Sequence, residues 1–192
     1  MKKLLLLLAL FPFITFAQEY TEVVEVPGKT AGQLYSSARE WFARSFISEN
    51  NPLLMDDLIS GKIIAKGSIQ ISDSTRSVDW YPNFTIKVSF KDGRYKAEIT
   101  DISITTGVSE YSIGITKPFK EYFDKKETYK MVSDPEWYIK NPPAGVKIGK
   151  AAARIAARPN QILYNLISKT ESEMMDLLTK LHYQMTKSED DW

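Results

Sequence analysis

Few residues in this chain have side chains suited to chemistry, and His182 comes first because it is the only histidine among 192 residues. A histidine can act as a general base near neutral pH, but it needs a nucleophile and an orienting carboxylate. Nothing in the sequence marks either group. The spacing of His182 from Leu178 puts it at the edge of an apolar helical stripe. We therefore predict a boundary position on a packed helix and name no catalytic residue.

The chain contains no cysteine, which excludes disulfides, thiolate catalysis and, with a single histidine, a typical structural zinc site. Neither a GxSxG elbow nor a phosphate-binding Walker loop occurs. Asp56 and Asp57 are adjacent, so on a strand their carboxylates point to opposite faces and do not converge. We predict no metal and no cofactor, and keep an enzyme that uses distant carboxylates as an unlikely alternative.

Two groups of residues are better candidates for binding. The first is aromatic and is expected either to contact a ligand or partner or to cover one end of a sheet: Phe119, Tyr122, Phe123, Trp137 and Tyr138. The second consists of Lys150, Arg154 and Arg158, which are four residues apart and share one helical face. They are expected either to be solvated or to meet anionic lipid or an acidic partner.

Ser74 is a candidate modification site. The triplet Asp73–Ser74–Thr75 resembles the acceptor motif of an O-glycosylation system that some Gram-negative bacteria use on exported proteins. It falls in a polar loop, as an acceptor must.

The N-terminus is typical of a cleavable signal peptide over residues 1–17. Lys2 and Lys3 precede an apolar run, and small residues lead to expected cleavage between Ala17 and Gln18. The run is too short to span a bilayer, and without a cysteine there is no lipid attachment site. We expect an exported protein, periplasmic or secreted, that is not a lipoprotein and has no transmembrane segment in its mature chain.

The remaining residues, 18–192, have the usual size of a single domain. Removal of Lys2 and Lys3 changes the formal net charge from +1 to −1. This balance offers no basic footprint for nucleic acid.

The elements that must position these residues follow from hydrophobic periodicity. Strands are expected over residues 21–26, 53–59, 62–71, 83–91 and 95–104, with another near Tyr111 to Ile115. Asp92–Gly93 predicts a hairpin turn, and the apolar phase shifts near Thr100–Asp101, as at a β-bulge.

Helices are expected at three places. Thr30 and Gln33 have capping-box spacing before an aromatic-rich amphipathic helix. Residues 117–158 lack strand alternation and read as an irregular or helical insertion, in which a basic helix over 147–158 ends at Pro159. A long helix is expected over about 160–186, opened by Pro159.

The order β-α-β-β-β-β-α predicts an α+β fold, an antiparallel β-sheet with helices packed on one face. The segments VVEVPGKTAGQLYSSAREWFARSF, SGKIIAKGSI and FTIKVSFKDGRYKAEITDISI resemble a family of exported bacterial domains of unknown function with a TATA-binding-protein-like (TBP-like) fold. The resemblance covers about residues 22–104 and the last helix. It implies topology, but no activity and no DNA binding.

These observations favour a non-enzymatic exported module that binds a partner, such as an envelope protein. The alternative is a carrier that holds a small apolar ligand between sheet and helices.

Overall fold

The computed structural model describes residues 19–45, 53–72, 79–107 and 115–187. The expected signal peptide with its cleavage site, Ser74, Tyr111 and the C-terminal residues 188–192 lie outside the described residues.

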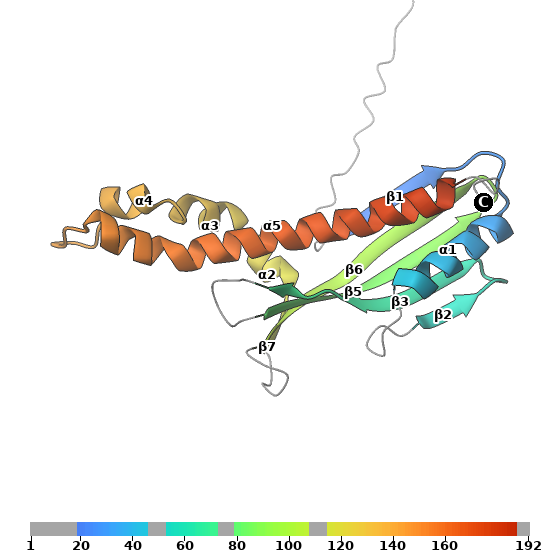
Figure 1. The fold of residues 1–192 in the computed structure, drawn as a ribbon, viewed down its shortest axis with the longest axis horizontal. Coiled ribbons are helices and arrows are strands. Elements are labelled where there is room, and N and C mark those ends of the chain that lie inside the picture. The colour runs from blue at the N-terminus through green and yellow to red at the C-terminus, as the bar shows by residue number, and fades with distance from the viewer. Residues whose placement is uncertain (1–18, 46–52, 73–78, 108–114, 188–192) are drawn as a thin grey trace, which may run out of the picture.

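The centre of the fold is an antiparallel sheet of seven strands in the order β1-β6-β5-β3-β2, with β4 paired to β5 and β7 paired to β6 (Figure 1). The strands are β1 (Tyr20–Glu25), β2 (Leu53–Asp57), β3 (Lys62–Ser68), β4 (Ile71–Ser72), β5 (Asp79–Lys91), β6 (Arg94–Gly107) and β7 (Ile115–Pro118). The predicted α+β class, an antiparallel sheet with helices on one face, is confirmed. The strand expected over 62–71 is divided after Ser68, where the Ile69 amide donates to Pro82 O.

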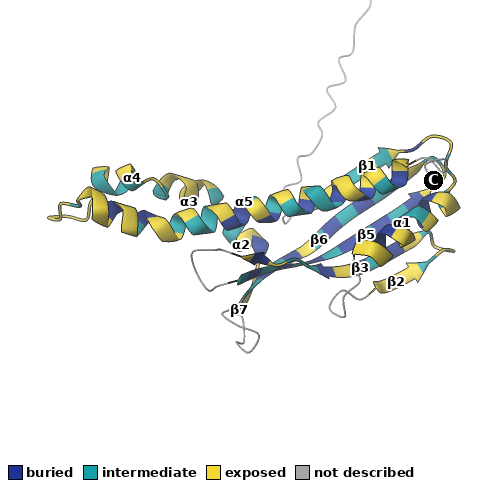
Figure 2. Ribbon diagram, viewed as in Figure 1, coloured by how far each residue is buried: buried dark blue, intermediate teal, exposed yellow. Residues whose placement is uncertain are grey.

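Strict alternation makes one face of the sheet apolar. Along β5 every second side chain from Trp80 to Phe90 is buried, and those between are partly exposed. This is the pattern of a sheet that is covered on one side only. All covering helices lie on this face (Figure 2).

The predicted bulge in β6 is confirmed. Asn83 pairs with Ser103 while Thr85 pairs with Thr100, so β6 carries one residue more than β5 at this point. Asp101 takes up the extra residue with φ of 54°, the left-handed region that only a few residue types tolerate.

Helix α1 (Ala31–Ser45) begins with the predicted capping box. The Thr30 amide donates to Gln33 Oε1 at 2.9 Å, and the Gln33 amide donates to Thr30 Oγ1 at 3.2 Å. Asp92, from the β5–β6 turn, adds a second cap by accepting from the Ala31 amide at 2.8 Å. In that turn Gly93 has the positive φ, 73°, and Asp92 does not. Trp41 and Phe42 of α1 are buried against the sheet, as expected.

The last helix, α5, runs from Lys150 to Thr186 with Pro159 inside it, so the expected boundary at Pro159 is wrong. Proline lacks an N–H, which removes one bond to the carbonyl of Ile155. Ile155 is 75% exposed, and water can satisfy that carbonyl. At the other end, Lys29 Nζ donates to the carbonyls of Met185 (2.8 Å) and Lys187 (2.7 Å).

Of the expected insertion, 117–158, the residues from 126 onward form a helical arm, whereas Lys117 and Pro118 end β7. Helices α3 (Lys126–Val132) and α4 (Pro135–Lys140) lie along the N-terminal part of α5 and extend beyond the sheet (Figure 1). Of the helices α2, α3 and α4, it is α2 (Phe119–Phe123) that sits against the sheet, where Phe119 is fully buried.

We predict that Asp101→Val lowers the free energy of unfolding by about 1–2 kcal/mol, because a β-branched residue resists positive φ. Asp101→Gly should stay within about 0.5 kcal/mol of the wild type, since glycine adopts this φ freely. Urea unfolding measures both, with Thr100→Val as the control at a residue without positive φ. Equal stability of the Val and Gly variants would contradict the bulge geometry.

Pro159→Ala should raise the free energy of unfolding by about 1–3 kcal/mol, because it restores a hydrogen bond inside α5 and removes the ring clash. Thermal unfolding followed by circular dichroism tests this. Ser172→Ala, at an exposed position of the same helix, should change stability by no more than about 0.5 kcal/mol. A destabilised Pro159→Ala protein would show that α5 requires the proline.

Candidate functional site

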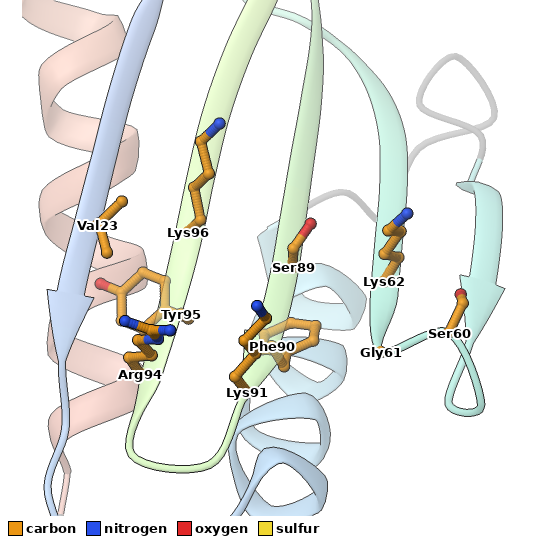
Figure 3. Close-up of a pocket in the computed structure, with 10 residues that line it drawn as sticks. All are labelled: Val23, Ser60, Gly61, Lys62, Ser89, Phe90, Lys91, Arg94, Tyr95 and Lys96. Atoms are coloured by element: carbon orange, nitrogen blue, oxygen red, sulfur yellow. The ribbon is translucent and has the colours of Figure 1, made fainter.

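The face of the sheet opposite α1 and α5 carries an open groove of about 340 Å³. Its centre is one row of outward side chains across four strands, because Val23 pairs with Lys96, Lys96 with Ser89, and Ser89 with Lys62. In Figure 3 these side chains stand on the near side of the sheet with the helices behind it. We call this feature the outer groove.

The next row toward the β5–β6 turn adds two more cations. Lys91 and Arg94 are directly opposite each other, and both line the outer groove. Like charges at facing positions of an antiparallel pair repel, so this arrangement costs stability in the free protein. Ser60 and Gly61, from the turn between β2 and β3, complete the rim.

Carboxylates offset only part of this positive charge. Glu98 accepts from Lys96 (2.7 Å) and from Lys87 (3.0 Å), and these hydrogen bonds to lysine lower the pKa of the Glu98 carboxyl. Glu25 lies 3.9 Å from Arg94. Lys62 faces Asp57 across the β2–β3 pair and helps to lower the pKa of that carboxyl. Lys91 makes no ion pair with any residue in the described ranges. The groove is therefore a positively charged surface with an apolar patch at Val23, which is 59% exposed.

The outer groove was not predicted from the sequence. Its cations come from β3, β5 and β6, and they become neighbours only through strand pairing. The available signal was the period-2 pattern itself, in which Lys87, Ser89 and Lys91 share one face of β5.

A second polar cluster lies on the covered face, where α5 meets β1 and β6. The buried Tyr95 hydroxyl is 3.4 Å from Glu22 Oε1 and 3.4 Å from His182 Nδ1. Burial raises the pKa of Tyr95 and of Glu22, while the nearby His182 acts in the opposite direction on Glu22. The Tyr95 hydroxyl of β6 thus joins α5 to β1 through His182 and Glu22. His182 itself is exposed on α5.

The five aromatic residues proposed from the sequence do not form one group. Tyr122 of α2 packs on Trp80 with ring centroids 5.0 Å apart, and Phe123 lies 6.1 Å from Phe119. Trp137 and Tyr138 instead belong to α4 on the arm, where Asn160 Nδ2 donates to Tyr138 Oη at 2.8 Å. The first set covers the end of the sheet, and the second fastens α4 to α5.

The other candidate residues also have clear positions. Lys150, Arg154 and Arg158 are exposed near the start of α5. Asp56 accepts from the Tyr35 hydroxyl and from Arg39 Nε (2.9 Å), whereas Asp57 accepts from the Ile59 amide in the turn. The two carboxylates thus have separate structural roles. Within the described residues no three His, Asp or Glu side chains gather to hold a metal ion.

Fold and groove together define an α+β protein of TBP-like topology, with a helix-covered face and a free, cationic face. Two solved structures have a similar fold. A TBP-like protein from Parabacteroides distasonis ATCC 8503 aligns with a TM-score of 0.51 and 11% identity, covering 85% of this chain and 92% of that one. A DUF4468 family protein from Bacteroides ovatus ATCC 8483 aligns with a TM-score of 0.53 and 15% identity, covering 91% and 89%. At these identities the likeness concerns the fold alone.

Residues 20–105 match the family model described as "Domain of unknown function (DUF4468) with TBP-like fold". This confirms the resemblance drawn from the sequence motifs over about residues 22–104. The match includes α1 and the strands through most of β6, and therefore the whole outer groove. No protein with a curated description matches the chain.

Glu22→Gln and Glu98→Gln should have opposite effects at pH 7. The pKa of Glu22 is raised in the folded state, so its favourable contribution exists at low pH and is lost as the pH rises through that pKa; the amide should stabilise the fold slightly. The pKa of Glu98 is lowered, so its contribution is present above about pH 4 and lost in acid.

Urea unfolding at pH 7 and pH 3 measures both effects. Glu98→Gln should cost about 0.5–1 kcal/mol at pH 7, Glu22→Gln should give a small gain, and both should approach the wild type at pH 3. Changes of the same sign at pH 7 would refute the assignment.

Proposed function

We propose that this protein is an exported, non-enzymatic binding module whose ligand is an anion held in the outer groove. The observation that carries the proposal is the set of four cations, Lys62, Lys91, Arg94 and Lys96, around one groove on the uncovered face of the sheet. Export rests on the N-terminal sequence pattern.

The size and chemistry of the groove suit a small polyanion that carries carboxylate or phosphate groups. A volume of about 340 Å³ is at the lower end of the range for ligand sites. Arg94 can bind two oxygens of such a group at once, and the lysines act as point charges. The hydroxyls of Ser60 and Ser89 add donors between them.

Bound anion would also relieve a repulsion that the free protein carries. Lys91 and Arg94 face each other across the β5–β6 pair, and Lys91 makes no ion pair in the described residues. Part of the binding free energy of a ligand that neutralises these charges comes from removing their mutual repulsion.

We do not propose a carrier of an apolar ligand. The layer between the sheet and its helices is occupied by buried side chains such as Phe42, Ile99 and Leu181, and the groove lies on the other face. We do not propose a carboxylate enzyme either, because the residues that line the outer groove include four cations and no Asp or Glu.

Titration calorimetry with pyrophosphate and with citrate tests the proposal. Lys91→Ala/Arg94→Ala should weaken binding at least about tenfold, since each lost charge-assisted hydrogen bond is worth about 1.5–3 kcal/mol. The matched control is Lys66→Ala/Lys169→Ala, which removes two exposed cations outside the groove. Equal affinity of both double variants, or no binding of either anion by the wild type, would overturn the proposed function.

A further inference from the structure

The far end of the helical arm is a second positively charged surface, separate from the outer groove. We call it the arm tip: α4, the loop of residues 141–149 and the first turns of α5, to Arg158. In Figure 1 it is the part of the molecule farthest from the sheet along the long axis. The fully buried Ala153 and nearly buried Ala157 have small side chains, which lets α4 pack closely on α5.

The charge of the arm tip is one-sided, because residues 135–158 contain five basic residues and one acidic residue, Glu136 at the start of α4. From Trp137 to Thr170 the chain has no Asp or Glu. The same stretch contains six basic residues, namely Lys140, Lys147, Lys150, Arg154, Arg158 and Lys169. Since the mature chain has nearly balanced charge, the compensating carboxylates lie elsewhere.

The cations of the arm tip are available to a partner. Lys147, Lys150, Arg154 and Arg158 are exposed and make no ion pair within the described part of the chain. On α5 the last three lie on one side of the helix, displaced by about 40° from one another, and Ile155 lies beside Arg158. The first turn of α5 has no acidic residue and no side-chain cap.

Exposed apolar side chains accompany these cations. Ile155 is 75% exposed and Val146 is 50% exposed. Neither packs in the hydrophobic core. Cations interspersed with apolar side chains on a projecting helical end are the pattern of surfaces that lie at a bilayer interface.

We propose that the arm tip docks the protein on a membrane surface that contains anionic phospholipid. Lys147, Lys150, Arg154 and Arg158 meet the phosphate groups, while Ile155 and Val146 enter the headgroup layer. Charge complementarity favours lipid, because each Lys or Arg near an anionic surface gains roughly 1 kcal/mol without any shaped pocket. Attachment is peripheral, and within the described residues no helix has the length and apolar character needed to cross a bilayer.

This inference is independent of the proposed function. The outer groove and the arm tip share no residue, and they lie on different parts of the molecule. Docking through the tip keeps the sheet away from the bilayer by the length of the arm.

Cosedimentation of the full mature chain with vesicles tests the inference, using phosphatidylcholine alone and phosphatidylcholine mixed with phosphatidylglycerol. The wild type should bind only the mixed vesicles, and less as salt rises. Lys150→Glu/Arg154→Glu/Arg158→Glu should reduce partitioning about 100-fold or more. Glutamate suits the start of a helix, so this variant should keep its fold, which circular dichroism checks.

The matched control is Lys66→Glu/Lys125→Glu/Lys169→Glu, an equal charge change at exposed positions outside the tip. It should retain most of the binding. Ile155→Ser, which leaves every charge in place, should weaken binding by a smaller factor of about 3–10. Equal loss in both triple variants, equal binding to neutral vesicles, or no binding to either vesicle would overturn the inference.

Discussion

The structure depends on one apolar stripe along α5 that is longer than the sheet it covers. Thirty-seven residues of helix extend about 55 Å. Leu166 to Met185 pack on the sheet, but Ala153 and Ala157 lie beyond its end and need another partner. Helices α3 and α4 supply that partner, and Lys126–Glu171 and Tyr138–Asn160 contacts hold them in place. The arm thus buries the apolar side chains of α5 that extend beyond the sheet.

Much of the sheet could be predicted because the sequence patterns that specify its strands and turns are local. The alternation in β5, the capping box at Thr30 and the phase shift at Asp101 each occupy a few consecutive residues, and each is confirmed. The helix boundary predicted at Pro159 is wrong because proline is only a local signal for a boundary, while the continuity of α5 comes from packing on both sides of this residue. Tertiary contacts outweighed local propensity there.

The candidate sites show the same division. Lys150, Arg154 and Arg158 could be grouped from the sequence because helical spacing joins residues that are near in sequence. The outer groove was missed because Val23, Lys62, Ser89 and Lys96 are joined only by the register of three strand pairs. A formal net charge of +1 also gives no sign of the outer groove, since it sums over surfaces that face in different directions.

The bonds from Lys29 to the carbonyls of Met185 and Lys187 have a consequence for the order in which the molecule forms. These bonds connect residues that are separated by 156 and 158 positions in the sequence. Strands β1 and β6 are also paired across a long stretch of chain. Helix α5, which covers the sheet beside α1, follows every strand in the chain. A nascent chain that ends within β6 has α1 but not α5 on its apolar face, so that face is fully covered only after residues 166–185 have been synthesised.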